Sequence, residues 1–478
     1  MLKVIIMAAG EGTRMKSSTS KVLHKLLNRE MIKYVVDASR FEDSKTIIIA
    51  GKNKKQIEEL FPNDLVIEQK IGENYPYGTG YAAFLASEYI EDNDQVLVLN
   101  GDIPLITKAS IKYFINNHLE NNNDASVLST KVINPISYGR IIRDDKGEFI
   151  GIVEHKDLNI NQNNIDEINT GIYIFKGPDF KDSIKQLNSS NNQNELYLTD
   201  CIEILSNEGK KVMAFTADHA DEFYGINTKK ELAEASKIIQ KRVNENHMLN
   251  GVIIETPDMV VIDPEVKIGK DTIISGPVKL LGKTIIGENC IIEGSSRIVN
   301  SILDNGVKID NSVIEDSSIG ENSDVGPYSH LRPKAKLGKH VHIGNFVEVK
   351  NSNVGDNTKA GHLAYVGDCD LGSGINIGCG VIFVNYDGKF KHRSIVGDDA
   401  FIGSNSNIVA PVNIEKDAYI AAGSTITKDV GSGMLSIERA EQKNIAGYTE
   451  KKRKRDLEKS KENLWHQVMQ RLLSKEEN

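Results

Sequence analysis

The chain has few of the residues that build disulfide scaffolds. Its four cysteines are scattered, form no CxxC pair and lie near no histidines at zinc-ligand spacing: Cys201, Cys290, Cys369 and Cys379. This pattern is typical of reduced thiols in a cytosolic protein. No apolar run is long enough to span a membrane, and the run at residues 1–7 is too short for a signal peptide. The sequence therefore predicts a cytoplasmic protein with a buried first strand.

Positive charge is outnumbered by negative charge. Lys and Arg number 58 against 67 Asp and Glu, which gives a net charge of −9. Nucleic-acid binding needs a clustered positive surface, so nucleic acid is not expected as a partner. Any phosphate site must come from a local group of Lys and Arg.

With 478 residues the chain is too long for one core, and two or three domains are expected.

Up to residue 228, short aliphatic runs alternate with longer amphipathic stretches. Strands are predicted at residues 3–7, 46–50, 95–100 and 125–132, and helices at 31–40, 54–61 and 79–91. This alternation indicates an α/β domain with a mostly parallel sheet and helices on both faces. A charged helix at 229–249 would connect this domain to the C-terminal half of the chain.

Between residues 250 and 437, aliphatic residues recur at every sixth position in three runs. The first run is Ile262, Ile268, Ile274, Leu280, Ile286, Ile292 and Ile298. The second is Val307, Val313, Ile319, Val325, Leu331, Leu337, Ile343 and Val349, and the third is Val396, Ile402, Ile408, Ile414, Ile420 and Ile426. Hexapeptide repeats predict a parallel β-helix, whereas a β-sandwich would need this spacing by chance. Glycines that follow some of these residues, such as Gly269 and Gly320, are expected at corners with an unusual φ.

The six-residue repeat is interrupted between residues 350 and 396. The residues 385–389 bulge from it before Val396 resumes the pattern. Such a break is either a mere insertion or the place of a site on a regular scaffold.

Two features near the N-terminus favour phosphate chemistry. Residues 8–14 form a glycine-rich turn directly after the first strand, where backbone N–H groups can cradle phosphate and Arg14 can neutralise it. Asp102 follows a buried strand, at the sheet edge where ligands collect. Both features have structural alternatives: a tight turn for the first, and a helix N-cap for the second.

Several motifs together resemble the bacterial bifunctional N-acetylglucosamine-1-phosphate uridyltransferase/glucosamine-1-phosphate acetyltransferases. In the N-terminal half they are residues 8–14, 21–24, 101–105, 138–141, 152–156, 169–171 and 225–227. In the C-terminal half they are residues 331–333, 345–350, 359–368, 376–378, 385–388 and 421–423. The resemblance covers nearly the whole chain. It implies a Rossmann-like nucleotidyltransferase domain, then a left-handed β-helix that forms a homotrimer.

The resemblance also implies roles for residues of the N-terminal half. UTP and UDP-N-acetylglucosamine would be bound by Ala8, Ala9, Gly10, Lys21, Gln69, Gly78, Thr79, Gly139, Glu154, Asn169 and Asn227. Arg14 would act in catalysis, and Asp102 and Asn227 would bind Mg²⁺. The phosphate of N-acetylglucosamine-1-phosphate would then attack UTP and release pyrophosphate.

In the C-terminal half, His362 would be the general base and Glu348 would orient it. Glucosamine-1-phosphate would be bound by Arg332, Lys350, Tyr365 and Asn376. Acetyl-CoA would be bound by Asn385, Tyr386, Ser404, Ala422 and Arg439. An imidazole suits this role because it titrates near neutral pH.

The sequence departs from the family pattern in places. Thr19 and Ser20 precede Lys21 where the family has Leu-Pro, and residues 71–77 are extra. Glu438 and Glu441 flank Arg439 with negative charge. The tail, residues 438–478, holds a basic run at 451–455, expected as a solvated face, and then an amphipathic pattern that would dock on the body or a neighbouring subunit.

Two other functions remain open. One is a hexose-1-phosphate nucleotidyltransferase with a regulatory β-helix, which gives no reason for His362 and Tyr365. The other is a non-catalytic scaffold trimer, which would not need Arg14, Asp102 and Asn227 together.

Overall fold

The computed structural model describes residues 1–10, 12–70, 72, 75–133, 135, 138–189 and 195–473. The chain divides into two compact units, residues 1–351 and 352–478. The domain limits expected at residues 228, 249 and 437 remain predictions. No described helix has the length and apolar character needed to cross a membrane.

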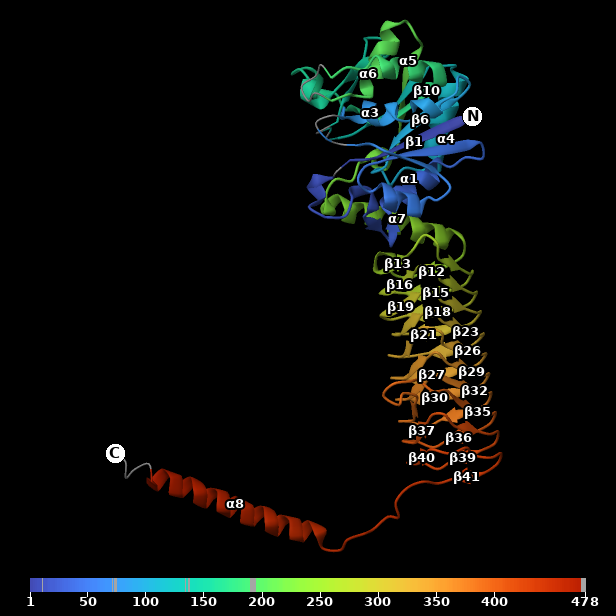
Figure 1. Ribbon diagram of the computed structural model, residues 1–478, viewed down its shortest axis with the longest axis vertical. Coiled ribbons are helices and arrows are strands. Elements are labelled where there is room, and N and C mark those ends of the chain that lie inside the picture. The colour runs from blue at the N-terminus through green and yellow to red at the C-terminus, as the bar shows by residue number, and fades with distance from the viewer. Residues whose placement is uncertain are drawn as a thin grey trace. The chain divides into compact units, whose positions relative to one another are not determined.

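A mixed sheet forms the centre of the N-terminal part, with seven strands in the order β11-β7-β10-β6-β1-β4-β5 (Figure 1). These strands are β1 (Leu2–Ala8), β4 (Ser44–Ala50), β5 (Leu65–Glu68), β6 (Gln95–Asn100), β7 (Ala125–Lys131), β10 (Glu167–Lys176) and β11 (Val212–Ala217). Among the seven only β10 runs antiparallel to its neighbours, β6 and β7, so the predicted mostly parallel sheet is confirmed. Beside this path, β8 (Arg140–Arg143) pairs with β10 and with β9 (Phe149–Val153), and β2 (Lys25–Leu26) pairs separately with β3 (Arg29–Glu30).

Helices cover both faces of this sheet because successive strand residues point to opposite sides. In β1, Val4 and Ile6 pack in one core with α1 (Met31–Ser39), α2 (Lys54–Leu60) and α4 (Lys108–Glu120). Ile5 packs in the other core with α3 (Thr79–Phe84), α5 (Gly177–Lys185) and α6 (Thr199–Asn207). The predicted strands and helices are therefore present, with 79–91 divided into α3 and a short 3₁₀ turn at Ser87–Tyr89.

The helix predicted at 229–249 is α7 (Lys229–Leu249). It begins with a capping box, in which Thr228 and Glu231 satisfy each other's backbone N–H groups. Near its end, the buried amide of Asn244 donates hydrogen bonds to the carbonyls of Pro257 and Val260, each at 2.9 Å. These bonds attach α7 to the start of the β-helix.

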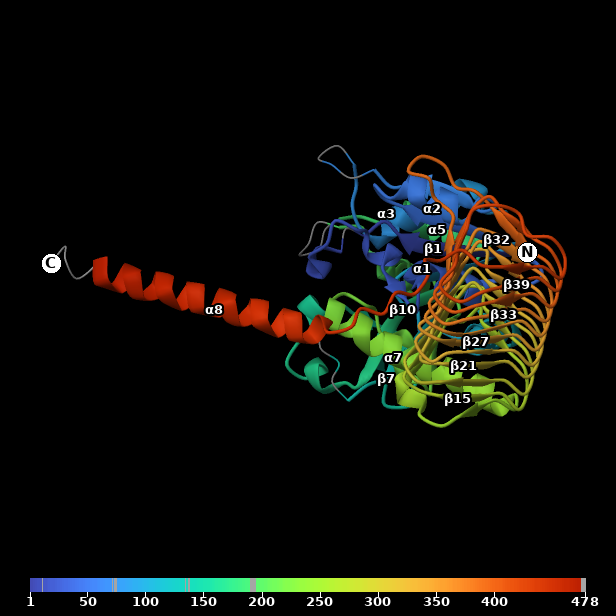
Figure 2. The same ribbon diagram turned by 90° about the horizontal axis from the view of Figure 1, so that it is seen from below.

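Three parallel sheets form the left-handed β-helix of the first unit (Figure 2). The first sheet holds β12 (Ile253–Ile254), β15 (Ile273–Ser275), β18 (Ile291–Glu293), β21 (Lys308–Asp310), β24 (Asp324–Val325) and β27 (His342–Asn345). The second holds β13 (Val260–Ile262), β16 (Val278–Leu281), β19 (Ser296–Val299), β22 (Val313–Glu315), β25 (His330–Leu331) and β28 (Glu348–Lys350). The third holds β14 (Lys267–Ile268), β17 (Ile285–Ile286), β20 (Ile302–Leu303), β23 (Ser318–Ile319) and β26 (Lys336–Leu337).

The second unit has coils of the same kind. One sheet holds β30 (Lys359–His362), β33 (Asn376–Ile377), β36 (Phe401–Ile402), β39 (Tyr419–Ile420) and β41 (Leu435–Ser436). Another holds β31 (Tyr365–Gly367), β34 (Ile382–Val384), β37 (Asn407–Val409) and β40 (Thr425–Ile426). The last holds β29 (Asn353–Val354), β32 (Cys369–Leu371), β35 (Ser394–Val396) and β38 (Asn413–Ile414). An exposed segment then leads to α8 (Tyr448–Leu473).

The period-six count is out of register at the start of the second run, where Ile292 pairs with Ile309 and not with Val307. Val313 is only half-buried, and Ile314 beside it is the inward residue, at 0% exposure. The cause is coil length: Ile298 pairs with Ile314 over 16 residues, whereas Leu280 pairs with Ile298 over 18. The repeat therefore shifts before residue 350 as well as after it.

The expected reason for the glycines is also wrong. Gly269, Gly320 and Gly397 do not have a positive φ. A Cβ on Gly320 would lie 2.4 Å from the carbonyl oxygen of Gly338, and one on Gly269 would lie 2.6 Å from the backbone of Gly287. These glycines are needed because successive coils approach closely, while asparagines such as Asn289 and Asn322 occupy left-handed corners.

The β-helix core predicts a contrast between two adjacent isoleucines. Ile286 is 2% exposed and Ile285 is 42% exposed. We expect Ile286→Ala to lower the free energy of unfolding by about 2–5 kcal/mol, because it leaves a cavity in the core. Ile285→Ala, the matched control, should change it by less than about 1 kcal/mol. Denaturant unfolding of both variants measures this, and equal losses would contradict the inward assignment.

Candidate active sites

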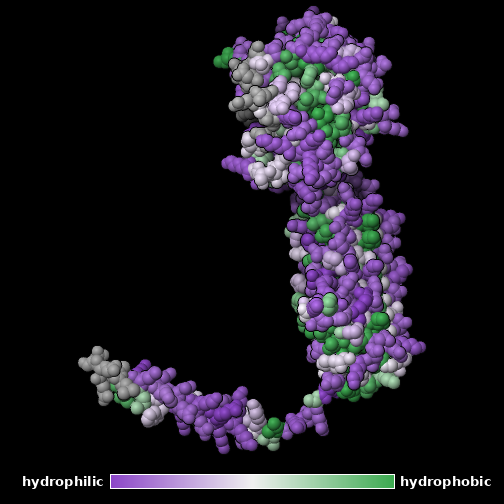
Figure 3. Space-filling view, in the orientation of Figure 1, coloured by the Kyte–Doolittle hydropathy of each residue, from purple (hydrophilic) through white to green (hydrophobic). Residues whose placement is uncertain are grey.

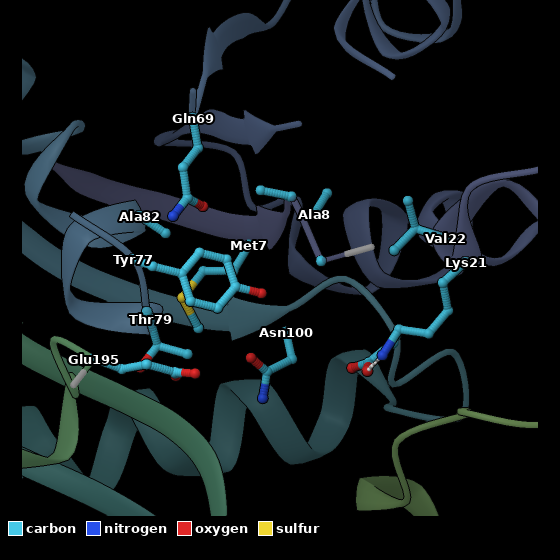
Figure 4. Close-up of a pocket in the computed structure, with 14 residues that line it drawn as sticks. Met7, Ala8, Lys21, Val22, Gln69, Tyr77, Thr79, Ala82, Asn100 and Glu195 are labelled. Atoms are coloured by element: carbon cyan, nitrogen blue, oxygen red, sulfur yellow. Dashed lines mark hydrogen bonds and ion pairs between the residues drawn. The ribbon is translucent and has the colours of Figure 1, made fainter. Parts of the chain in front are cut away.

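A cavity of about 220 Å³ opens at the carboxyl ends of β1 and β6 (Figure 4). Eight of the residues expected to bind nucleotide or metal line it: Ala8, Ala9, Gly10, Lys21, Gln69, Gly78, Thr79 and Asp102. Figure 4 shows Gln69, Tyr77 and Thr79 around one end of it and Lys21 at the other. The structure therefore brings the glycine-rich turn and the end of β6 to one site, as the parallel sheet requires.

A cluster of charged and amide groups lies at the Lys21 end of the cavity. The Lys21 ammonium forms an ion pair with the Asp102 carboxylate and donates a hydrogen bond of 3.0 Å to Oδ1 of Asn227. The Arg14 guanidinium donates to the same oxygen at 2.8 Å. The backbone N–H of Ile226 donates to the carbonyl of Asp102 at 2.9 Å, which fixes Asn227 beside Asp102.

Two glycines are required by this geometry. Gly12 has a φ of 61°, and a Cβ there would lie 2.6 Å from Cβ of Lys21. Gly78 has a φ of 118°, and its Cβ would lie 2.3 Å from the carbonyl oxygen of Leu196. Gly12 thus lets the turn close on Lys21, and Gly78 lets two chain segments meet at the cavity wall. Glu11 of the turn, and Ile71, Glu73 and Asn74 of the extra segment, lie outside the described residues.

A second cavity, of about 200 Å³, shares Met7, Thr79 and Asn100 with the first. It is lined by the three residues expected to bind the sugar, Gly139, Glu154 and Asn169. The Asn169 amide is held by two contacts: it donates to the Tyr173 hydroxyl at 2.7 Å and accepts from the N–H of Gly171 at 3.0 Å. The shared residues make the two cavities adjoining parts of one cleft.

Carboxylates gather at this second cavity, and one of them, Glu154, lines it. Burial raises the pKa of Glu154. Burial, and then the charges of Glu203, Glu154 and Asp157, raise the pKa of Asp200 to about 6. Asp200 lies in the first turn of α6, next to Thr199, which lines the cavity.

This raised pKa predicts a pH-dependent effect of Asp200→Asn. A carboxyl group whose pKa is raised in the folded state favours folding most below its unfolded pKa of 3.8, and that contribution is lost as the pH rises through about 6. The stability of the variant relative to the parent should therefore grow by about 1 kcal/mol between pH 4 and pH 8, since water screens a half-exposed group. Thermal unfolding across this range measures it, and a constant difference would contradict the prediction.

In the first unit's β-helix, the structure brings together two of the residues expected to act in acyl transfer. The Arg332 guanidinium forms an ion pair of 2.9 Å with the Glu348 carboxylate. Lys350 lies on the same strand as Glu348, two residues further along β28. This leaves the expected role of Glu348 beside His362 as a prediction, because His362 belongs to the second unit.

In the second unit, His362 ends β30 and its side chain is exposed. Asn376 is in the paired strand β33, opposite Lys359. The buried Asn385 amide donates to the Tyr365 hydroxyl at 3.2 Å and to the Asp368 carboxylate at 2.5 Å. Asn385 therefore ties the base of the bulging loop to Tyr365.

The bulging loop is an ordered turn. The N–H of His392 donates to the carbonyl of Asn385 at 2.8 Å, and Tyr386 pairs with Lys391. The Asp387 carboxylate accepts bonds from the backbone of Phe390, from His392 and from the backbone of Lys389, and these lower its pKa to about 2. The loop thus presents the exposed Tyr386 ring from a fixed base.

The residues expected to contact acetyl-CoA come from successive coils of the second unit. The N–H of Gly423 donates to the carbonyl of Ser404 at 2.8 Å. This bond places Ser404 on the coil next to the one that carries Ala422 and Gly423. The Arg439 guanidinium donates to the carbonyl of Ala422 at 2.7 Å. The Glu438 carboxylate accepts a hydrogen bond of 3.2 Å from the N–H of Thr425.

Comparison with known proteins covers both halves. A nucleotidyl transferase family model matches residues 3–242, a GMPPB C-terminal domain model matches residues 256–355, and a model of six bacterial transferase hexapeptide repeats matches residues 393–428. The "Bifunctional protein GlmU" of Clostridioides difficile strain 630 is 49% identical over 455 residues, which are 95% of this chain and 98% of that protein. The protein of the same name from Alkaliphilus metalliredigens is 43% identical over 454 residues, which are 94% of this chain and 98% of that protein.

The chain belongs to the GlmU family. The nucleotidyl transferase match spans every residue of the N-terminal cleft, from Met7 to Asn227. This chain covers 98% of the length of the two GlmU relatives. The similarity first indicated by short motifs therefore extends over both the N-terminal and the C-terminal half of these proteins.

Nucleotidyl transfer generally depends on a metal ion, and the N-terminal cleft of this GlmU relative fits one. Asp102 and Asn227 already present oxygens to a single cation, the Lys21 ammonium. Within the described part of the chain, His, Cys, Asp and Glu side chains do not gather in threes that could hold a metal. Two protein oxygens are nevertheless the kind of incomplete set that Mg²⁺ uses when phosphates supply further ligands.

Sequence reasoning missed several residues that line the GlmU cleft. They are Met7, Val22, Tyr77, Ala82, Asn100, Tyr138, Thr170, Gly171, Tyr173, Glu195 and Thr199. Asn100 could have been found, since it ends the strand before Asp102. Glu195 and Thr199 could not, because they reach the cleft only through the folding of a segment about 100 residues away in the chain.

Proposed function

We propose that this chain makes UDP-N-acetylglucosamine in two steps. The C-terminal half transfers acetyl from acetyl-CoA to glucosamine-1-phosphate, and the N-terminal half joins the product to UTP with release of pyrophosphate. The observation that carries this is the match of one chain, over 95% of its length, to proteins named bifunctional, together with a cleft at the carboxyl ends of β1 and β6 that has Lys21 and Arg14 at one end.

In the uridyl transfer, the sugar phosphate oxygen attacks the α-phosphorus of UTP, and the bond to the β-phosphate breaks. Such a transfer needs positioning and charge neutralisation more than covalent help. Gln69, Gly78 and Thr79 hold the uracil, and Gly139, Glu154 and Asn169 hold the sugar. Lys21 and Arg14 neutralise the phosphates, with the rest of the turn at Ala8, Ala9 and Gly10 donating backbone N–H groups.

Mg²⁺ would be held by Asp102 and Asn227, where it would supply charge neutralisation for the pyrophosphate leaving group. Lys21 and Arg14, which both donate hydrogen bonds to Oδ1 of Asn227, would bind the phosphate oxygens beside it.

In the acetyl transfer, the glucosamine nitrogen attacks the thioester carbon, a C–N bond forms, and the C–S bond breaks. His362 takes the proton that the amine loses, and the thiolate of CoA is protonated as it leaves. Arg332, Lys350, Tyr365 and Asn376 would bind the sugar phosphate, with Glu348 orienting His362. Asn385, Tyr386, Ser404, Ala422 and Arg439 would bind acetyl-CoA. We place these steps in the cytoplasm, in a homotrimer.

One reaction mixture tests the proposal. Purified full-length protein is incubated with UTP, glucosamine-1-phosphate, acetyl-CoA and Mg²⁺, and UDP-N-acetylglucosamine is sought by mass spectrometry. Thiol release without UTP, and pyrophosphate release with N-acetylglucosamine-1-phosphate, test the halves separately. Pyrophosphate release without thiol release would instead favour a nucleotidyltransferase with a regulatory β-helix. The absence of both reactions would favour a non-catalytic scaffold.

A further inference from the structure

The C-terminal helix α8 has no role in the proposed chemistry, and it divides into two chemically different halves. It is 26 residues long, and every side chain described in it is exposed. The first half carries the basic run, residues 451–455. The second half carries five exposed apolar side chains, Leu464, Trp465, Val468, Met469 and Leu472, and Leu457 precedes them in the first half. Figure 3 shows the hydrophilic surface of α8 giving way to paler, more hydrophobic residues toward its C-terminal end.

The apolar residues of the second half share one side of the helix. Leu464, Val468 and Leu472 follow one another at intervals of four, and Trp465 and Met469 extend the same stripe. Asn463, Gln467 and Gln470 lie on the opposite side. Trp465 is 68% exposed and Leu464 is 63% exposed, which is unusual for an aromatic and aliphatic group in water.

The charge of α8 is opposite to that of the chain. The helix has eight Lys or Arg and four Asp or Glu, whereas the whole chain carries a net charge of −9. An anionic surface would therefore attract this helix and repel the remainder. A helix with Trp and Leu on one side and clustered Lys and Arg elsewhere is the type that lies in the interface of an anionic membrane.

A coiled coil with other copies of α8 would fit the stripe less well. Lys461 stands between Leu457 and Leu464 on the apolar side, and Lys454 continues that side toward the N-terminus. In a parallel bundle these lysines would face their own copies, with like charges opposed. At a lipid interface the same side chains can extend toward the headgroups while their methylene stems contact the acyl region.

We propose that α8 binds the surface of membranes rich in anionic lipids, with Leu464, Trp465, Val468 and Leu472 inserted and residues 451–455 against the headgroups. The exposed segment 437–447 joins the helix to the last coil and contains Gly447 at a φ of 72°. The enzyme would thus be held at a membrane surface without spanning it. This does not depend on the function proposed for the two active sites.

Trp465 gives a direct test because it is the only tryptophan of the chain. The full-length protein is mixed with vesicles of phosphatidylglycerol and phosphatidylcholine, and with vesicles of phosphatidylcholine alone. We expect the Trp465 emission to shift to shorter wavelength, and its quenching by acrylamide to fall, only with the anionic vesicles. The shift should vanish at salt concentrations where the Debye length is about 3 Å.

Two triple variants separate the apolar side from the polar side. L464Q/V468Q/L472Q should weaken vesicle binding by about tenfold or more, because three apolar side chains lose their lipid contacts. N463A/Q467A/Q470A should bind as the parent protein does. Both should keep acetyl and uridyl transfer in solution.

Several outcomes would overturn the proposal. One is no spectral change with anionic vesicles, and another is equal losses in the two variants. A third is a spectral response to duplex DNA or RNA but not to vesicles, which would assign the helix to nucleic acid. The last is a change in subunit number for L464Q/V468Q/L472Q with no vesicle binding by the parent, which would assign it to other copies of the chain.

Discussion

We expect His362→Ala to slow acetyl transfer by a factor of about 100 or more while uridyl transfer keeps its parental rate, which is the usual effect of losing a general base. The loss should fall mainly on kcat, because Arg332, Lys350 and Tyr365, which would bind the sugar phosphate, are unchanged. Thiol release from acetyl-CoA, measured as a function of glucosamine-1-phosphate and of pH, tests this.

The matched control is His466→Ala, which removes an exposed histidine from α8 in the same unit. Its acetyl transfer should equal that of the parent. If His362→Ala acetylates at a near-parental rate, His362 is not the base, and the geometry around Asn385 and Tyr365 would need another proton acceptor.

We expect Asp102→Asn to slow uridyl transfer by a factor of about 100 or more, since it removes the one carboxylate proposed to hold the metal. The concentration of Mg²⁺ needed for half-maximal rate should rise as well. Acetyl transfer should be unchanged. Pyrophosphate release from UTP and N-acetylglucosamine-1-phosphate, titrated with Mg²⁺, measures both effects.

Asp92→Asn serves as the control for this substitution. Asp92 is an exposed carboxylate that forms an ion pair with Lys181, away from the cleft. Its rate and Mg²⁺ requirement should match those of the parent. A normal Mg²⁺ requirement in Asp102→Asn, with or without a lower rate, would remove Asp102 from the metal site.

The N-terminal sheet could be predicted because its strands are buried on both faces. Runs such as residues 96–99 are apolar throughout, and the chain reverses between them by amphipathic helices. The same topology places the ends of β1 and β6 side by side, so the turn at Gly10 and the carboxylate of Asp102 were expected together. Three of the seven strands of the central path were not predicted, β5, β10 and β11, and of these β10 also departs from the pattern because it runs antiparallel.

The contact of Lys21 with Asn227 could not be obtained from pattern alone. More than 200 residues separate them, and nothing in the local sequence of Asn227 indicates a ligand. Its position depends on the strand ends and on Glu231, whose carboxylate accepts the N–H of Asn227 at 2.7 Å. The resemblance to a known family supplied this residue where physical reasoning from the sequence did not.

The β-helix shows a different limit of sequence reasoning. A strict count of six identified most inward residues but chose Val313 over Ile314, because the lengths of the corners vary. The register between coils is fixed by the side chains that must be buried, and not by a constant number of residues per coil. At this position the buried side chain is Ile314.

Coil length varies in this fold while the strands on either side stay paired in register. Paired residues are separated by 16 residues from Ile298 to Ile314 and by 25 from Leu371 to Val396, yet both pairs are in register. The additional residues of the bulging loop around Asn385 therefore lie outside the stack of coils and leave its strand pairing unchanged. Natural variants could lengthen, shorten or replace that appendage while the scaffold keeps its shape, so new substrates could be accommodated without redesigning the protein's interior.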